Sequence, residues 1–353
     1  MPLPPNETHF TITIVAKFLS NLKIGDSHHK PVSPKASYTA MPGGSHFVRF
    51  GFLFIFFICF FCVTGCGGVT GQPATSSPNQ PAQPGQSVQF GHVFILVEEN
   101  AEYSNVISNP AMPYLNSLGM QNGIATNYYA NGHPSIPNYF ELTAGQTLTF
   151  DDSATPQGFP ISADNVVHEL IAAGKSWKSY AESLPSAGYT GNDSGKYAVR
   201  HNPLAYFSDV QNSNSQAQNL VPFTQLASDL SAGTLPQYSF IVPNLCDDAH
   251  DCSLTTADSW LQNNIDSLVK SSAFQKNGLL IIVFDEADTS DVAHGGGHIP
   301  AVIVSPFAKH GFQSTTFYQH QSALRLSLEG LGVTKLPGDA AKAPAMWEFF
   351  NAQ

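Results

Sequence analysis

Strand-like apolar runs alternate with amphipathic segments through most of the chain. The predicted strands are residues 90–97, 124–129, 176–180, 238–242, 279–284 and 299–305. The predicted helices are residues 112–118, 139–144, 164–173, 223–232, 255–272 and 319–331. Several of the runs are apolar on both faces, which is typical of strands buried in a parallel sheet. The alternation therefore predicts an α/β fold, a three-layer sandwich with a central, mainly parallel sheet.

The first 89 residues lack this alternation. A short apolar run, residues 52–63, follows Arg49. A basic residue before a short apolar run has the form of a secretory signal, and the run is too short to span a bilayer comfortably. It ends in Val63-Thr64-Gly65-Cys66, which resembles the cleavage box of bacterial lipoproteins, with Cys66 as the lipid-modified residue. Met41 would be a sensible start for such a signal, and an uncleaved anchor helix is the alternative.

These features divide the chain into three parts. Residues 1–66 form an N-terminal extension and a lipoprotein-type signal, residues 67–89 form a flexible linker rich in Gly, Pro, Gln and Ser, and residues 90–353 form one large domain. We therefore expect an exported protein that is anchored to a membrane through an N-terminal lipid.

Two cysteines remain in the large domain, Cys246 and Cys252. A local pair in an exported protein most simply forms a disulfide, and a metal-binding pair is the alternative. Beyond Cys66 the chain has 10 Lys and Arg against 24 Asp and Glu. A domain this acidic is a poor match for nucleic acid, whose phosphates attract clusters of Lys and Arg, so we expect no nucleic-acid partner.

Polar groups follow three of the predicted strands, residues 90–97, 238–242 and 279–284. In chain order these groups are Glu99, Asn100, Asp248, His250, Asp285 and Glu286. If the three strands are parallel neighbours, their carboxyl ends meet at one edge of the sheet. Carboxylates packed together repel each other and need a cation. Oxygen ligands with an occasional His suit Mg²⁺, Ca²⁺, Mn²⁺ or Zn²⁺, although any single pair could instead cap a helix.

The segment 133–139, His-Pro-Ser-Ile-Pro-Asn-Tyr, places the hydroxyl of Ser135 between two prolines. The prolines keep Ser135 out of the middle of a helix and place it near a helix start. Backbone N–H groups and the helix dipole favour negative charge there, which suits a nucleophile that attacks phosphorus. A plain helix cap is the alternative. A histidine could protonate the leaving alcohol, and His133, His201 and His250 are the candidates.

Six motifs stand out in chain order. They are Val97-Glu98-Glu99-Asn100, Met112-Pro113-Tyr114-Leu115-Asn116, the segment 133–139, Pro243-Asn244 with Asp248-x-His250-Asp251, Phe284-Asp285-Glu286, and Tyr318-Gln319-His320-Gln321-Ser322-x-x-Arg325. Together they resemble the bacterial phosphoesterase family, which contains secreted acid phosphatases and phospholipases C and shares the alkaline-phosphatase-like fold. The resemblance covers about residues 92–335. Nucleotide pyrophosphatases of the same fold carry a Thr-Phe-Pro-Asn-x-Tyr segment with a Thr nucleophile, which residues 135–145 match without gaps.

This resemblance implies roles for individual residues. Ser135 is the nucleophile and Asn138 a phosphate contact, and Arg200, in the polar loop 183–220, is assigned to substrate binding. The implied metal ligands are Glu99, Asn100, Asp285 and Glu286, and the residues of a second metal site or of leaving-group protonation are Asp248, His250 and His201. His298 and His320 are further members of the site. The more distant alkaline-phosphatase ligand set is richer in Asp and His, so the residues here support one cation better than two.

The resemblance implies an enzyme that hydrolyses phosphate monoesters with a divalent metal ion and a seryl-phosphate intermediate. Its substrate would be a small-molecule or lipid phosphate ester, phosphoinositides included. The chain lacks the extra C-terminal domains of many phospholipases C, which favours a phosphatase, and phospholipase C-type cleavage of phosphodiesters is the alternative. A non-catalytic, cation-dependent binding lipoprotein is an alternative of another class. It predicts the loss of site residues, and none of the main ones is missing.

Overall fold

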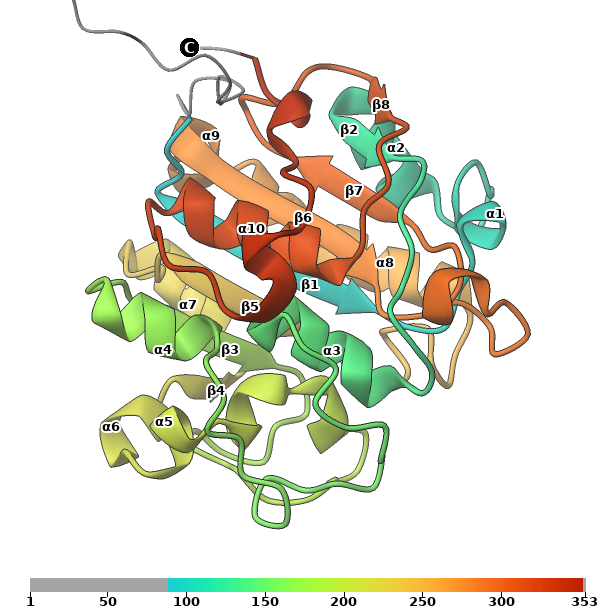
Figure 1. Ribbon diagram of the computed structural model, residues 1–353. Helices are drawn as coiled ribbons and strands as arrows, with labels where there is room; N and C mark the ends of the chain where they lie inside the picture. The colour runs from blue at the N-terminus through green and yellow to red at the C-terminus, as the bar shows by residue number, and fades with distance from the viewer. Residues whose placement is uncertain (1–87, 352–353) are drawn as a thin grey trace, which may run out of the picture. The chain divides into compact units, whose positions relative to one another are not determined.

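A computed structural model describes residues 88–351. The predicted signal, Cys66 and the linker up to residue 87 lie outside these residues. In the described part of the chain, eight strands form one sheet in the order β4-β3-β5-β1-β6-β7-β2-β8 (Figure 1). The strands are β1 (His92–Glu98), β2 (Gly123–Ala125), β3 (Trp177–Ala181), β4 (Leu220–Pro222), β5 (Tyr238–Val242), β6 (Gly278–Phe284), β7 (Ala301–Val304) and β8 (Phe312–Ser314).

The first five strands in this order, β4 to β6, run parallel to one another. β7 is antiparallel to both β6 and β2, and β2 pairs in parallel with β8. The predicted α/β fold with a central, mostly parallel sheet is therefore confirmed. The strand predicted at residues 299–305 exists as β7 but runs against its neighbours. An apolar run indicates burial and says nothing of the direction of a strand.

Helices cover both faces of the sheet. They are α1 (Tyr103–Val106), α2 (Pro113–Gln121), α3 (Ser135–Ala144), α4 (Val166–Ala172), α5 (Ser208–Gln211), α6 (Asn214–Ala217), α7 (Gln225–Ala232), α8 (Leu254–Val269), α9 (Ser272–Asn277) and α10 (His320–Gly330). In Figure 1, α3, α4 and α10 lie in front of the sheet, and α7, α8 and α9 lie behind it. These are the three layers. None of the helices within residues 88–351 has the length and apolar character needed to cross a membrane.

Two segments differ from the prediction. The loop predicted at residues 183–220 contains α5, α6 and the start of β4, all of four residues or fewer, which are too short for a periodic pattern to show. The strand predicted at residues 124–129 ends at Ala125. Backbone pairing continues beyond Ala125 as separate bonds, with Thr126 N donating to Ser314 O and Tyr129 N donating to Tyr318 O, and does not form a continuous ladder there.

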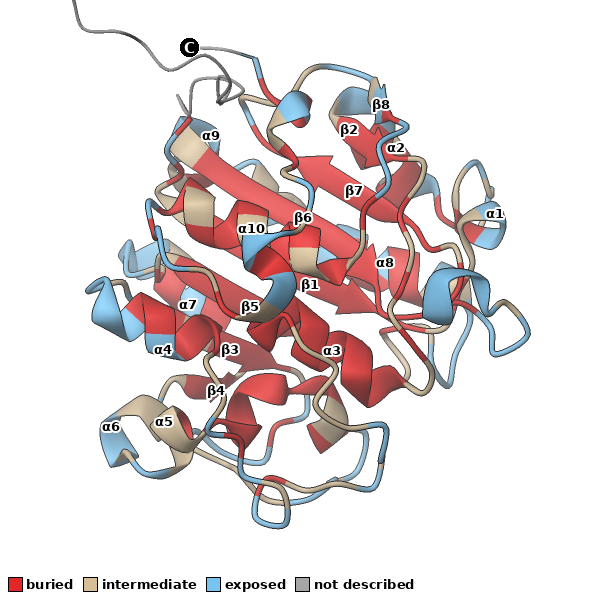
Figure 2. Cartoon of the chain, viewed as in Figure 1, coloured by how far each residue is buried: buried red, intermediate tan, exposed pale blue. Residues whose placement is uncertain are grey.

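The central helix of the front layer, α3, is buried along its whole length (Figure 2). It begins at Ser135, directly after Pro134 in extended backbone, and ends at Gly145, whose φ of +63° is a left-handed conformation that glycine adopts without strain. It packs between the sheet, α10 and the turns at residues 199–206. A helix enclosed in this way fixes the position of its first residue, Ser135.

Enclosure of α3 also buries a carboxyl group. The side chain of Glu141 is buried and accepts a hydrogen bond from Thr147 Oγ1 at 3.0 Å. Burial, with a smaller contribution from the charge of Asp339, raises the pKa of Glu141 from 4.5 to about 7. The folded protein therefore keeps a proton that the unfolded chain releases above pH 4.5. The contribution of Glu141 to the free energy of unfolding is fully present below pH 4.5 and is lost as the pH rises towards 7.

We expect the substitution Glu141→Gln to remove this pH dependence, because Gln keeps the contact with Thr147 and does not ionise. The free energy of unfolding of the variant relative to the wild type should rise by about 1–3 kcal/mol between pH 4.5 and pH 7. Urea unfolding at a series of pH values measures it. Asp339→Asn, which removes the exposed carboxylate facing Glu141, should show a smaller change. A difference between Glu141→Gln and the wild type that stays constant with pH would contradict the assignment.

Candidate active site

The carboxyl ends of β5, β1 and β6 meet at one edge of the sheet, with β1 between the other two. Two main-chain hydrogen bonds join the segments that follow these strands: Glu99 N donates to Asp248 O at 2.7 Å, and Asp285 N donates to Glu98 O at 2.9 Å. The structure thus brings together the three strand ends that the sequence singled out. Four carboxylates gather here and all are buried, namely Glu99, Asp248, Asp285 and Glu286.

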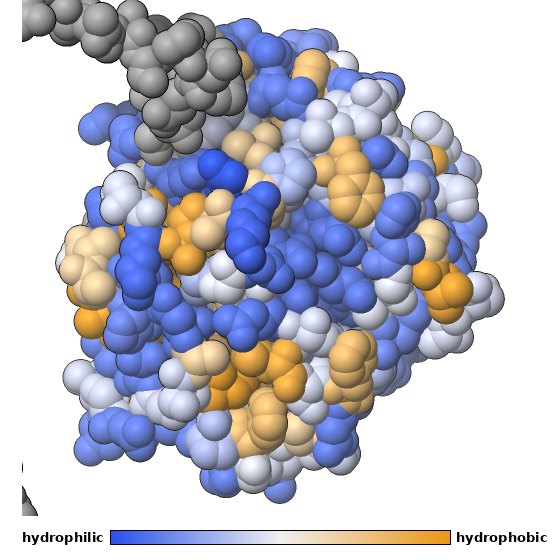
Figure 3. Space-filling model, in the orientation of Figure 1, coloured by the Kyte–Doolittle hydropathy of each residue, from blue (hydrophilic) through white to orange (hydrophobic). Residues whose placement is uncertain are grey.

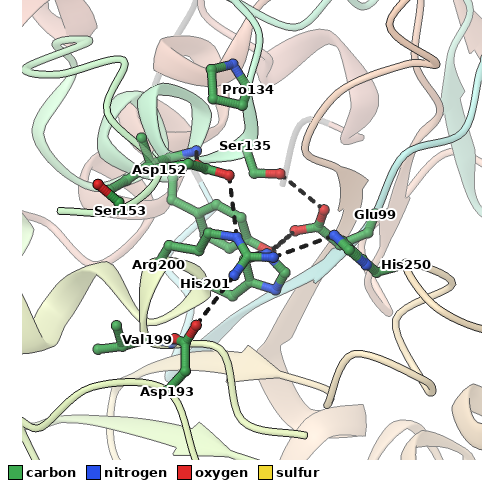
Figure 4. A network of polar contacts seen from close by, with 12 residues as sticks. Glu99, Pro134, Ser135, Asp152, Ser153, Asp193, Val199, Arg200, His201 and His250 are labelled. Atoms are coloured by element: carbon green, nitrogen blue, oxygen red, sulfur yellow. Dashed lines mark hydrogen bonds and ion pairs between the residues drawn. The ribbon is translucent and has the colours of Figure 1, made fainter. Parts of the chain in front are cut away.

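Ser135 is the first residue of α3 and is almost fully buried. Its hydroxyl oxygen lies 3.2 Å from Glu99 Oε2 and 3.3 Å from Glu286 Oε1, and it can donate its one proton to either (Figure 4). The residue before the helix, Pro134, offers no side-chain cap to the first turn. The N–H groups of this turn therefore have no acceptor from the preceding residue, and that of Ile136 donates to Asp152 Oδ1 at 3.1 Å.

The backbone and side chain of Asn100 arrange two of the carboxylates. Asn100 has a φ of +55°, in the left-handed region that Asn tolerates better than most residues. In this conformation its N–H donates to Asp285 Oδ1 at 3.1 Å, and its Nδ2 donates to Glu99 Oε2 at 3.1 Å. The other oxygen of Glu99 accepts a 2.5 Å hydrogen bond from the hydroxyl of Tyr139.

His201 lies between two carboxylates. Its Nε2 is 3.1 Å from Glu99 Oε1, its Nδ1 is 3.4 Å from Asp248 Oδ2, and its ring stacks on Tyr139 with centroids 5.1 Å apart. Burial lowers the pKa of His201 well below its usual range, so the ring is neutral and carries a single N–H. One of its nitrogens therefore presents a lone pair to a carboxylate oxygen.

The pKa values of the cluster reflect crowded negative charge. Burial is the largest cause for each group. It raises the pKa of Asp248 and of Asp285 to about 7, and that of Glu99 well above its usual range, where the charge of Asp285 adds to it. Burial and the charge of Asp285 raise the pKa of Glu286 to about 9. The cluster binds protons near neutral pH unless a cation neutralises it.

The donor atoms fit a cation. One oxygen of Glu99, one nitrogen of His201 and one oxygen of Asp248 lie within 4.8 Å of one another. In addition, His201 Nε2, Asp248 Oδ2 and Asp285 Oδ2 are buried without a hydrogen-bond partner. Buried polar atoms are rarely left unpaired in proteins, and this set of oxygens with one imidazole nitrogen is a ligand set that divalent ions accept.

Arg200 lies at the solvent side of the cluster and is held by two carboxylates (Figure 4). Its Nε is 3.3 Å from Asp152 Oδ2, and its Nη1 is 3.6 Å from Asp193 Oδ2. Its Nη2 lies 3.3 Å from Nε2 of His250, whose Nδ1 is 2.8 Å from Asp251 Oδ1. The loop that carries His250 is closed by a disulfide between Cys246 and Cys252.

His133 lies beside the nucleophile segment with both ring nitrogens engaged. Nε2 donates to the carbonyl oxygen of Asp291 at 2.9 Å, so Nε2 carries a hydrogen. Nδ1 is 2.7 Å from Glu286 Oε2, and a proton sits between these two atoms. His133 and Glu286 therefore share one proton beside the nucleophile segment.

Three further predicted residues support the surroundings of the cluster. Asn138 is fully buried, and its amide bonds to backbone groups of the segment 131–134, which holds the loop before Ser135 and leaves a phosphate contact as a prediction. His320 Nε2 donates to the carbonyl oxygen of Asp285 at 2.7 Å. His298 donates to Thr126 O, and its ring lies against two tyrosine rings, so these contacts within the described chain are made outside the cluster.

Sequence reasoning missed Tyr139, Asp152 and Asp193. The position of Tyr139 in the site could have been predicted, because it is four residues after Ser135 and thus on the same face of the helix. The two aspartates lie in irregular loops, 17 and 58 positions from Ser135, where no spacing rule applies.

Comparisons with known proteins agree with this geometry. Residues 104–330 match the model of the Phosphoesterase family. The chain belongs to the Phosphoesterase family. A phosphatidylinositol-3-phosphatase of Mycobacterium tuberculosis is 33% identical over 262 residues, which are 74% of this chain and 83% of that protein. A probable acid phosphatase of Kluyveromyces lactis is 30% identical over 246 residues, or 68% of this chain and 58% of that one, so the chain spans just over half of this relative.

A solved structure confirms the fold of this phosphoesterase. A protein of the alkaline phosphatase superfamily from Vibrio parahaemolyticus superposes with a TM-score of 0.50 over 78% of this chain and 77% of that one, at 15% identity. The family match confirms the predicted family, and this superposition confirms the predicted alkaline-phosphatase-like fold. With phosphatases among its relatives, the chain is a phosphoric ester hydrolase that acts on phosphate esters.

Proposed function

We propose that this phosphoesterase hydrolyses phosphate monoesters with Ser135 as the nucleophile and a divalent cation at the carboxylate cluster. The observation that carries the proposal is the position of the Ser135 hydroxyl. It lies at the start of a buried helix and within 3.3 Å of two carboxylates, Glu99 and Glu286, that belong to a cluster of four. Ser135 follows the cap position, which Pro134 occupies, and its hydroxyl bonds to carboxylates of the cluster, which a plain helix cap would not need.

The nucleophile needs to lose its proton as it attacks phosphorus. With a cation at the cluster its carboxylates would stay ionised, and either Glu99 or Glu286 could then accept the proton directly from the hydroxyl. The bond from Ser135 Oγ to phosphorus forms as the bond to the leaving alcohol breaks, and water then hydrolyses the phosphoseryl group in a second step. The start of α3 favours the extra negative charge that this group brings.

The residues that would hold the cation are Glu99, Asp248, His201, Asp285 and Glu286, with Asn100 beside them. A bound divalent ion would supply positive charge that stabilises the phosphoryl transition state and lowers the pKa of the serine. Tyr139 fixes one oxygen of Glu99, and the backbone N–H of Asn100 fixes one oxygen of Asp285, so both carboxylates are oriented before anything binds.

We assign protonation of the leaving alcohol to His250. The other two candidates are more enclosed: His133 lies between Glu286 and Asp291 O, and His201 is buried between carboxylates. His250 is partly exposed, and Asp251 orients its Nδ1. In the free enzyme its Nε2 accepts a hydrogen bond from Nη2 of Arg200, and this contact has to open before Nε2 can carry the proton that the leaving alcohol takes up.

Monoesters are favoured over diesters by the names of the relatives, a phosphatidylinositol-3-phosphatase and acid phosphatases, all of which are monoesterases by name. The first of these acts on a lipid phosphate, so lipid phosphate monoesters belong to the proposed substrate class. Cleavage of phosphodiesters, and a binding role without catalysis, remain the alternatives that experiments must separate.

We also propose that the protein is exported and anchored at a membrane by a lipid on Cys66. The signal-like run at residues 52–63 and the sequence before Cys66 support this. The disulfide between Cys246 and Cys252 agrees with an oxidising compartment.

Substitution of the nucleophile tests the mechanism. Ser135→Ala should lower kcat for p-nitrophenyl phosphate at least about a thousandfold, because the covalent route is lost. Its melting temperature should stay close to that of the wild type. Acid quenching of the wild type during turnover of a labelled substrate should trap phosphate on Ser135. A Ser135→Ala enzyme with the full rate would remove this residue from the nucleophile role.

Metal removal and a substrate panel test the remaining parts of the proposal. Activity on p-nitrophenyl phosphate should disappear with EDTA and return with one of Mg²⁺, Ca²⁺, Mn²⁺ or Zn²⁺, because the carboxylates then regain their counter-charge. The bis-ester and phosphatidylcholine should be poor substrates beside p-nitrophenyl phosphate and a phosphoinositide. Activity on the diesters alone would overturn the monoesterase proposal, and inactivity on every ester would favour the binding role.

The anchor has its own test. In cells that produce the full chain, Cys66→Ser should move the protein from the membrane fraction to the soluble fraction and abolish labelling with a radioactive fatty acid, since the thiol is the only attachment point proposed. The substitution Cys59→Ser, at a cysteine within the apolar run, is the matched control and should leave both properties unchanged. Equal membrane association of the Cys66→Ser protein would instead support an uncleaved anchor helix.

A further inference from the structure

The loop after α3 places a carboxylate against the start of that helix. Asp152 Oδ1 accepts a hydrogen bond from the backbone N–H of Ile136 at 3.1 Å, one residue after Ser135. Pro134 gives the helix no side-chain cap, and Pro137 has no N–H, so the N–H of Ile136 is one of few donors in the first turn. A phosphoryl group on Ser135 would need these same donors.

The other oxygen of Asp152 faces Arg200, at 3.3 Å from Nε. This contact is an ion pair without hydrogen-bond geometry, since Nε of Arg200 is buried and has no hydrogen-bond partner. A buried guanidinium N–H without an acceptor is uncommon and marks a place where an acceptor can bind. Asp152 is about one third exposed and can move away into solvent, whereas Arg200, at 17% exposure, is held in place by its other contacts.

One carboxylate therefore bridges a helix N–H and an arginine, which is the pattern of contacts that two oxygens of a phosphoryl group make at such sites. Figure 4 shows Asp152, Arg200 and Ser135 facing the same space.

We propose that Asp152 is an internal competitor of the substrate: in the free enzyme its carboxylate occupies the Ile136 N–H and the Arg200 guanidinium, and the phosphoryl group of the substrate displaces it. The inference rests on the proposed function, in which Ser135 is the site of phosphoryl transfer. Asp152 touches neither Ser135 nor a cluster carboxylate, so it sets the affinity of the site for phosphate and takes no part in bond making.

The consequence is quantitative. If a ligand binds only when Asp152 has turned away, its apparent affinity is the intrinsic affinity multiplied by the fraction of enzyme in that state. Removing the carboxylate should therefore tighten the binding of every phosphate ligand by the same factor. Inorganic phosphate, as product, should be affected as much as the substrate.

The test compares Asp152→Asn and Asp152→Ala with the wild type in the complete chain. KM for p-nitrophenyl phosphate and the inhibition constant of inorganic phosphate should both fall by about threefold to tenfold in Asp152→Asn, and at least as much in Asp152→Ala, which frees the Ile136 N–H completely. Asp151→Asn is the matched control. It removes the same charge one residue away, from a carboxylate that bonds only to Ser153, and both constants should stay within about twofold of the wild type.

Other results would distinguish a failure of the competitor role of Asp152 from a failure of the proposed function. A higher KM with a lower kcat in both Asp152 variants would show that Asp152 positions Arg200 for catalysis and would overturn the competitor role. Unchanged constants would overturn it as well. If instead the wild type neither hydrolyses monoesters nor binds inorganic phosphate by titration calorimetry in the presence of divalent ions, the proposed function itself fails, whatever the Asp152 variants do.

Discussion

The rest of the site depends on the buried negative charge at the carboxyl edge of the sheet. Glu99, Asp248, Asp285 and Glu286 would each be ionised at neutral pH in water, and here burial raises all four pKa values. The sheet prevents the groups from moving apart, because β1 and β6 lie in the buried core and pair along their whole length. Charge that cannot separate must be neutralised by protons or by a cation. Binding of a cation would therefore release protons, so the two equilibria are linked.

Neighbouring groups orient the carboxylates without neutralising them. Tyr139 and Asn100 donate to Glu99 and Asp285, and His320 holds the backbone of Asp285 through its carbonyl oxygen. None of these donors carries a positive charge, and burial lowers the pKa of His320 to about 4, which keeps it neutral. The arrangement is therefore rigid and still short of positive charge. The donor set could therefore hold a cation, whereas in a structural ion-pair network Arg or Lys would supply the positive charge.

Most residues of this cluster could be predicted from the sequence because they come directly after buried strands. Apolar runs located β1, β5 and β6, and the polar residues directly after them had to meet once those strands were neighbours. The residues of β7 do not show that this strand is antiparallel to its neighbours. β4 and β8 have three residues each, which is too short for a pattern to be recognised. The phosphate contact of Asn138 stays a prediction: its amide bonds to the loop at residues 131–134, and the residue type alone does not distinguish the two roles. Asp152 and Asp193 reach Arg200 from loops, and only the packed chain brings them there.

Arg200 shows how an acidic site can accept an anion. A phosphate monoester brings further negative charge to a place already lined by carboxylates, and the described chain sets against it the start of α3, the guanidinium of Arg200 and the proposed cation. In the free enzyme the charge of Arg200 is matched by Asp152 and Asp193. If the phosphoryl group simply added to these carboxylates, repulsion would oppose binding. If it replaces Asp152, the number of anions around Arg200 stays the same and the displaced carboxylate regains its hydration. Binding is then an exchange of one anion for another, which makes affinity for phosphate adjustable at Asp152 without any change to Ser135 or to the cluster that surrounds it.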